Sequence, residues 1–171
     1  MKKISLLIVM LALFACEKTT KELAGFGGFD IDSNFSSHAK SSEFRNTMPG
    51  EYYCHSLVLS SDIGKVSDLN VTTANGKIIE VKFSSNESTN IDNIQKQFLP
   101  LNKIEKSMNV ENDIAIFNTY SSKNESIFFI DIEYKNETMK NGKSKHEFIY
   151  SNKKAIEDGD KLIKSMASNM R

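Results

Sequence analysis

The strongest pattern in this chain is an alternation of apolar and polar side chains, which is typical of β-strands with one covered and one solvated face. It runs through residues 52–60, 113–120, 126–134 and 145–150. In the third of these segments the side chains fall into two sets, Phe128, Ile130, Ile132 and Tyr134 against Phe129, Asp131 and Glu133. We expect the second set to lie on the solvated face.

A hairpin is predicted around Ala74-Asn75-Gly76, where turn-forming residues separate two apolar runs. In a regular ladder, a two-residue turn would place Val71 opposite the charged Glu80, whereas a three-residue loop places it opposite Ile79. We therefore expect the longer loop, followed by a strand over 77–84 with Ile79 facing inward.

Two helices are also expected. Thr89-Asn90-Ile91-Asp92 has the form of a capping box, and apolar residues then recur at steps of three and four as far as Met108. Pro100 lacks a backbone donor and should kink or break this helix near Leu99. A second helix is predicted over 152–170, where the apolar residues again have helical spacing.

These elements predict an α+β fold. The expected architecture is an antiparallel sheet of about five strands, with a central and a C-terminal helix packed on one face. The folded part should be a single domain over residues 29–171, since a chain of this length forms one modest core.

The N-terminus has a different pattern, in which two lysines precede an unbroken small and apolar run over residues 4–15. About twelve such residues are too few to span a bilayer core of about 30 Å, and they indicate a secretory signal. The run ends in Leu13-Phe14-Ala15-Cys16, which resembles the lipobox of bacterial lipoproteins, although Phe14 is larger than the family's usual residue there. The resemblance implies removal of residues 1–15 and lipidation of Cys16. The alternatives are a plain signal peptide with a coincidental cysteine and a buried apolar helix.

Lipid on Cys16 would hold the protein at a membrane, because two or three acyl chains bury enough methylene groups for stable attachment. The polar and glycine-rich stretch 16–28 is expected to be a flexible tether. Glu17 is not the aspartate that retains enterobacterial lipoproteins in the inner membrane. The resemblance therefore favours the outer membrane, with the domain facing the periplasm.

Composition limits the functions further. The formal net charge is zero, and after removal of Lys2 and Lys3 with the leader there are 20 basic and 22 acidic side chains. This balance gives no basic surplus for nucleic acid. With Cys16 lipidated, Cys54 has no partner for an intramolecular disulfide, so it is either buried or available to another protein.

Few residues suggest catalysis or a cofactor. His38, His55 and His146 have no metal-ligand spacing, and the chain has no nucleophile elbow, phosphate loop or dinucleotide fingerprint. We therefore assign no catalytic, cofactor-binding or metal-ligating residue. Asp131 and Glu133 share a strand face about 7 Å apart, a pair that can perform acid–base chemistry if a histidine converges on it.

The most plausible functional surface is the uncovered face of the sheet. Phe129 is the leading candidate to anchor a protein partner there, and Asp131 and Glu133 lie on the same predicted face. These three residues form the predicted partner-binding surface. The alternative is that the aromatic residues of the strands pack under the terminal helix or the N-terminal segment.

The function that follows is a membrane-anchored envelope lipoprotein, not an enzyme, which binds another envelope protein for assembly, inhibition, immunity or exclusion. One alternative is a lipid-anchored periplasmic hydrolase using Asp131, Glu133 and a histidine, which must converge in a concave site. The other is a carrier for an apolar ligand, which requires a buried apolar cavity.

Overall fold

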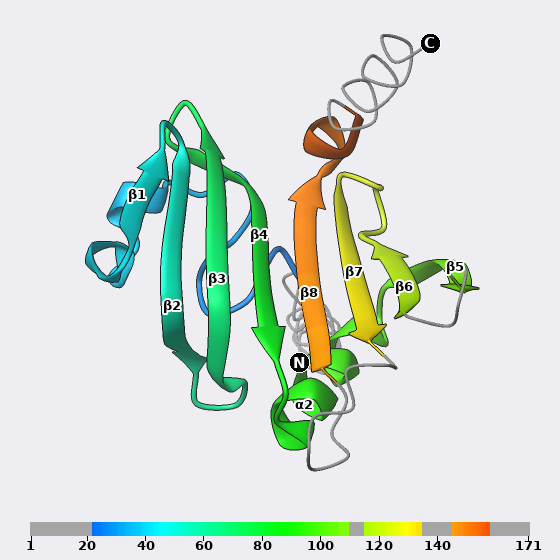
Figure 1. Cartoon of the computed structure of the whole chain (residues 1–171). Coiled ribbons are helices and arrows are strands. Elements are labelled where there is room, and N and C mark those ends of the chain that lie inside the picture. Colours follow the sequence, from blue (N-terminus) through cyan, green and yellow to red (C-terminus); the bar gives the residue numbers. More distant parts are fainter. Residues whose placement is uncertain (1–21, 110–114, 135–144, 158–171) are drawn as a thin grey trace, which may run out of the picture.

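The protein is built around one antiparallel sheet. The computed structural model describes residues 22–109, 115–134 and 145–157, and in these residues eight strands pair in the order β1-β2-β3-β4-β8-β7-β6-β5 (Figure 1). The strands are β1 (Arg45–Met48), β2 (Glu51–Ser60), β3 (Gly64–Ala74), β4 (Lys77–Ser85), β5 (Asn102–Asn109), β6 (Ala115–Ser121), β7 (Ile127–Tyr134) and β8 (Lys145–Asn152). The helices named in these residues are η1 (Phe35–Ser37), η2 (Ser41–Glu43) and α2 (Ser88–Phe98).

The sheet consists of two four-stranded meanders joined at the centre. Strands β1 to β4 pair in chain order, and so do β5 to β8. Strands β4 and β8 pair antiparallel, from Glu80 opposite Ser151 to Ser85 opposite His146. Because α2 leads from β4 at the centre to β5 at the far edge, the second meander returns from that edge to the centre.

The hairpin between β3 and β4 has a two-residue turn, so the predicted three-residue loop is wrong. Asn75 and Gly76 both have positive φ, 52° and 76°, which is the requirement of a type I′ turn. An irregularity in the ladder leaves Ile79 unpaired and places Val71 opposite Val81. In a regular ladder, the short turn would bring apolar and charged side chains onto one face of the sheet. Because Ile79 is unpaired, the ladder shifts by one residue and the short turn no longer has this disadvantage.

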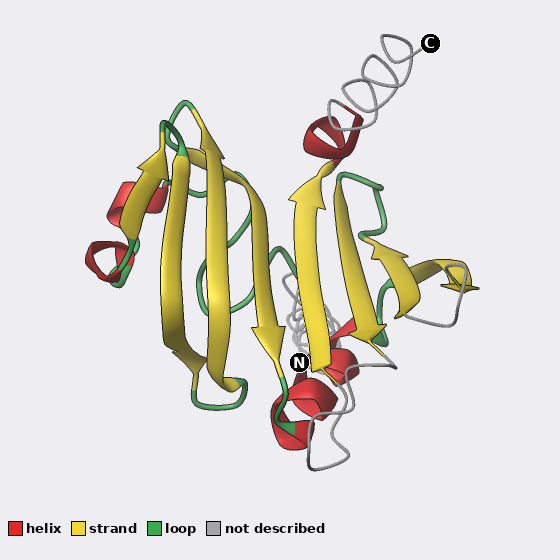
Figure 2. Cartoon of the chain, in the orientation of Figure 1, coloured by secondary structure: helices red, strands yellow, loops and turns green. Residues whose placement is uncertain are grey.

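One face of the sheet is covered by the N-terminal segment, residues 22–44, and by α2, which both lie behind the strands in Figure 2. The ring of Phe26 lies 5.5–6.2 Å from the rings of Phe83, Phe98, Phe129 and Tyr150. The Tyr150 hydroxyl accepts a hydrogen bond from the Phe26 backbone N–H and donates one to a carbonyl oxygen of the same segment. The core therefore lies between this segment, α2 and the sheet.

Residues 25–28 belong to the packed segment, although their composition predicts a flexible tether. Phe26 is 2% exposed, and Gly27 and Gly28 have φ values of 63° and 86° that let the chain turn around it. A Cβ atom on Gly25 would collide with the Phe29 carbonyl oxygen. Ordered, buried structure therefore begins before residue 29.

Helix α2 begins at Ser88, one residue before the predicted cap, and ends at Phe98, beside the predicted break at Leu99. Its buried apolar side chains form a stripe of Ile91, Ile94 and Phe98. The apolar spacing that continues to Met108 does not extend the helix, because Pro100 interrupts it and residues 102–109 form the edge strand β5.

The predicted α+β fold, with about five strands and two helices on one face, is therefore wrong. The sheet has eight strands, and within the described residues α2 is the one full α-helix. Of the predicted helix over 152–170, residues 153–157 are helical and lie beyond the end of β8 (Figure 1), while 158–170 lie outside the described residues. The N-terminal segment takes the covering role that was expected of the second helix.

Candidate functional site

The predicted partner-binding surface lies on the covered face of the sheet, so Phe129 cannot anchor a partner. Phe129 is 0% exposed and packs against Phe26, Phe98 and Tyr150. Asp131 and Glu133 follow it on the same face of β7, and Asp131 is 1% exposed. The alternation in β7 is present, but both sets contain large apolar residues, so the pattern does not identify which set faces the core.

Asp131 belongs to a buried polar network that joins the sheet to α2. Its Oδ1 lies 2.7 Å from His146 Nδ1 on β8, and its Oδ2 accepts a hydrogen bond of 2.8 Å from Gln95 Nε2 on α2. His146 is 6% exposed and stacks beside Phe148. Since buried polar groups are stable only when paired, these contacts fix α2 over β7 and β8.

This network meets one requirement of the hydrolase alternative, because it brings Asp131 together with a histidine. Ser85 lies opposite His146 in the β4–β8 pair, and its buried hydroxyl has no hydrogen-bond partner. The other histidines lie elsewhere: His38 stacks on the Phe29 ring in the N-terminal segment, and His55 is on β2. In the described ranges, no three His, Cys, Asp or Glu side chains are grouped to hold a metal ion.

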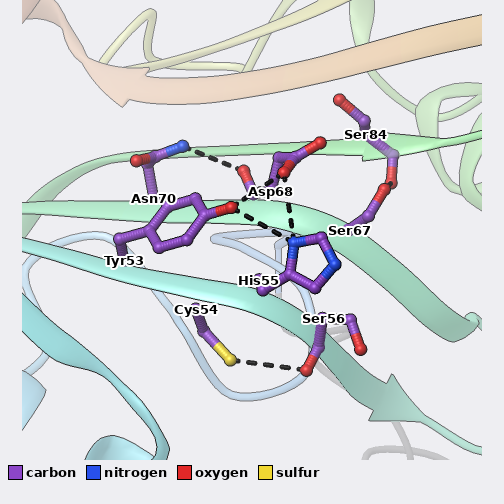
Figure 3. Close-up of polar contacts among 8 residues, drawn as sticks. All are labelled: Tyr53, Cys54, His55, Ser56, Ser67, Asp68, Asn70 and Ser84. Atoms are coloured by element: carbon purple, nitrogen blue, oxygen red, sulfur yellow. Dashed lines mark hydrogen bonds and ion pairs between the residues drawn. The ribbon is translucent and has the colours of Figure 1, made fainter.

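The uncovered face carries a second cluster, formed by Tyr53, His55 and Asp68 on β2 and β3 (Figure 3). The Tyr53 hydroxyl donates a hydrogen bond of 2.9 Å to Asp68 Oδ1 and lies 3.4 Å from His55 Nδ1. The guanidinium of Arg45 on β1 lies over the Tyr53 ring, 4.7 Å from its centre. The side chains of His55 and Asp68 are 86% and 51% exposed. We call these four residues the polar cluster.

An irregularity in β3 places this cluster on the open face. Asp68 has a φ of 52°, and the ladder between β3 and β4 shifts between Ser67 and Asn70. As a result, Leu69 and Val66 are both buried although they are three positions apart. On the paired strand β2 the buried residues Cys54 and Leu57 are also three positions apart. His55 lies between them and projects away from the core.

Two open concavities lie beside the polar cluster. One, of about 370 Å³, is lined by Glu43, Arg45, Tyr53, Cys54 and His55. The other, of about 350 Å³, begins at His55 and extends over polar residues at the ends of β3 and β4. A third, of about 400 Å³, is lined by residues of η2, β2 and β3. Asp131 and His146 line none of the three, so the buried network has no access through them.

The two halves of the open face differ in chemistry. On β1 to β4 it carries the polar cluster together with Asn70, Thr72, Glu80 and Lys82. On β6 to β8 most residues of this face are apolar, and Ile132 among them is buried: Phe117, Phe128, Ile130, Ile132 and Ile149. An ion pair between Lys82 and Glu147 marks the boundary at the β4–β8 junction.

The ionisation of several open-face groups is shifted. The hydrogen bond to Asp68 raises the pKa of the Tyr53 phenol above its ordinary value. The hydrogen bond to Glu147 raises the pKa of Lys82 above its ordinary value. Burial raises the pKa of Glu80 because a carboxylate is poorly solvated there.

Sequence reasoning missed the polar cluster. Tyr53 and His55 are in a predicted strand, but Asp68 is in the next strand, and no spacing in the sequence relates the two. One available signal was Asp68 itself, since aspartate within an apolar run favours turns and bulges. Cys54, in the middle of the same strand, is buried and has no disulfide, in agreement with one of the two roles expected for it.

No family model, curated protein or solved structure matches this chain. In the ranges that the structure describes, no helix has the length and apolar character needed to cross a membrane.

Proposed function

We propose that this protein is a lipid-anchored lipoprotein of the bacterial envelope that works by binding another envelope protein, without catalysis. The lipobox-like sequence ending at Cys16 supports the anchor, and the outer membrane facing the periplasm remains the favoured location. The binding surface that we propose is the polar half of the open face, in place of Phe129, Asp131 and Glu133.

The observation that carries this proposal is the exposed and ordered polar cluster. Tyrosine and arginine dominate the binding energy of many protein interfaces, and here Arg45 holds the Tyr53 ring while Asp68 holds its hydroxyl. Side chains that are already ordered lose less conformational entropy when they bind. The neighbouring concavity of about 370 Å³ is large enough to receive a side chain of the partner.

The alternative functions have weaker support. The hydrolase would use Asp131 and His146, but both side chains are enclosed by the sheet and α2 and hold each other. The apolar-ligand carrier would need an internal cavity, whereas the described core is filled by aromatic rings in mutual contact, and the three concavities open onto the surface.

Affinity capture of envelope proteins from detergent extracts tests the binding function. The full chain carrying Tyr53→Ala should lose its captured partner by at least tenfold, because a central interface tyrosine contributes about 2 kcal/mol or more. Asp68→Asn keeps the backbone conformation and should weaken capture less. Lys96→Ala, on the exposed side of α2, is the matched control and should capture normally. Capture that is equal for Tyr53→Ala and wild type would contradict the proposed surface.

The anchor is tested in the same cells by labelling with a fatty acid. Cys16→Ser should abolish incorporation of the label, while Cys54→Ser should retain it, since Cys54 is buried in the domain. Label that persists in Cys16→Ser would remove the lipoprotein from the proposal and leave the binding surface to be judged by capture alone.

A further inference from the structure

We infer that the protein bound at the polar cluster is recognised through an extended, acidic segment that pairs with the outer edge of β2. This edge is the side of residues 54–58 that faces away from β3, and we call it the β2 edge. The inference deepens the proposed function and rests on it, because it gives the conformation and charge of the partner segment that reaches the polar cluster.

Strand β2 is much longer than the strand beside it. β1 has four residues and β2 has ten, and β1 pairs only with the stretch from Glu51 to Tyr53. No other described strand pairs with this side of β2, and Figure 1 shows β2 extending past the start of β1. Such an edge presents backbone donors and acceptors, and another protein can add a strand to it. Residues 54–58 span about 16 Å, enough for about five residues of an extended segment.

Two carbonyl groups of the β2 edge are held by side chains instead of a strand. The Ser56 carbonyl accepts a hydrogen bond of 3.4 Å from Cys54 Sγ (Figure 3), and the Val58 carbonyl accepts one from the Lys40 ammonium. Residues two positions apart direct their carbonyls toward the same edge. A thiol is a weak donor and a lysine side chain is flexible, so the backbone N–H groups of an incoming strand can replace both.

Two concavities follow the β2 edge one after the other. The first, of about 370 Å³, is lined by residues 53–55, and the second, of about 400 Å³, is lined by residues 56–58. Glu43, the last residue of η2, lines both of them. Together they form a groove between η2 and β2. An extended segment in this groove would have its backbone against β2 and side chains in the concavities.

The charges of the groove favour an acidic segment. Its basic lining residues are Lys40, Arg45 and Lys65, whereas Glu43 is the one acidic residue that lines either concavity. Arg45 and Lys65 are exposed. When an incoming N–H takes the Val58 carbonyl, the Lys40 ammonium is released and can pair with a carboxylate. Because opposite charges attract across an interface and like charges repel, glutamate or aspartate in the segment is favoured over lysine or arginine.

The groove leads directly into the polar cluster. Arg45, Tyr53 and His55 belong to the cluster and also line the first concavity. Asp68, the acidic member of the cluster, lines neither concavity and accepts the hydrogen bond of the Tyr53 hydroxyl. A segment paired with the β2 edge therefore brings the adjoining part of its protein against Tyr53, and one partner can use both features.

Fluorescence anisotropy of the full chain in detergent tests the inference with a labelled hexapeptide of alternating glutamate and valine. Wild type should bind it at least about tenfold more tightly than a hexapeptide of alternating lysine and valine, because only the acidic peptide complements the groove. A fully N-methylated acidic peptide keeps its charge but has no backbone donor, and it should bind at least about tenfold more weakly. No binding of the acidic peptide, equal affinity for the basic peptide, or unchanged affinity after methylation would each overturn the inference.

A charge reversal places the peptide in the groove. Lys65→Glu should weaken binding of the acidic peptide at least about fivefold, because one attraction becomes a repulsion. Lys96→Glu makes the same change of charge on the exposed side of α2 and should bind like wild type. Far-UV circular dichroism checks that both variants are folded. Equal affinities of folded Lys65→Glu and Lys96→Glu would overturn the inference.

These results are separate from those of the capture experiment. Capture that depends on Tyr53, together with no binding of the acidic peptide, would overturn pairing at the β2 edge and leave the proposed surface in place. Peptide binding with the expected preferences, together with capture that Tyr53→Ala does not change, would support the β2 edge and contradict the polar cluster as the anchor.

Discussion

Replacing Phe26 by alanine should destabilise this protein strongly, although its sequence context predicts a tether. The Phe26 ring is 2% exposed and contacts four aromatic rings at 5.5–6.2 Å. Truncating a phenylalanine in such a core removes its transfer free energy and leaves a cavity, which together cost about 3–5 kcal/mol. Since small domains have about 5–15 kcal/mol of stability, this is a large fraction of the total.

Equilibrium unfolding in urea measures this effect. Phe26→Ala should lower the midpoint with little change in the m value, and should lower Tm by roughly 10–15 °C. Leu99→Ala is the matched control, because Leu99 is 82% exposed and its truncation should cost less than about 0.5 kcal/mol. A loss below about 1 kcal/mol for Phe26→Ala would refute the packed N-terminal segment and restore a tether that reaches residue 28.

Two further predictions concern polar groups, the half-buried Glu80 and the buried Asp131. Burial raises the pKa of Glu80 in the folded state, so ionisation opposes folding, and Glu80→Gln should raise the urea midpoint at pH 7. That gain should disappear as the pH falls below the ordinary carboxyl pKa, where Glu80 is protonated in both states; a gain that persists at pH 3 would contradict the burial argument. Asp131→Ala leaves His146 and Gln95 buried without their shared acceptor and should cost about 3 kcal/mol in the same assay. A cost under about 1 kcal/mol would mean that the network does not hold α2 to the sheet.

The strands with the clearest alternation were predictable, because the period of two is a local property. The segments 52–60 and 126–134 correspond to β2 (Glu51–Ser60) and β7 (Ile127–Tyr134). The edge strand β5 was not predictable. Ile104 and Met108 are four positions apart, which fits a helix as well as a strand, and within the described sheet an edge strand pairs on one side only.

The site was harder to predict than the strands because it depends on which face is covered. In β7 either set of side chains could form the core, and the choice is made by Phe26 and Phe98, which lie far away in sequence and pack on Phe129. Asp131 resembles a solvated carboxylate until Gln95 and His146 are brought to it by α2 and β8. These are tertiary effects that no local period contains.

The central pairing of β4 with β8 also sets the order in which this protein can fold. Residues paired there are roughly sixty to seventy positions apart, whereas the other strand pairs join neighbours in the chain. Each meander can form early, but the halves cannot join until β8, the last strand described, is available, and contacts of such high sequence separation slow folding. The Phe26 N–H donates a hydrogen bond to the Tyr150 hydroxyl across 124 positions, so the N-terminal segment cannot complete its packing until β8 is in place. A chain shortened before β8 would leave the apolar N-terminal segment without its cover, and should aggregate or be degraded rather than persist as a smaller domain.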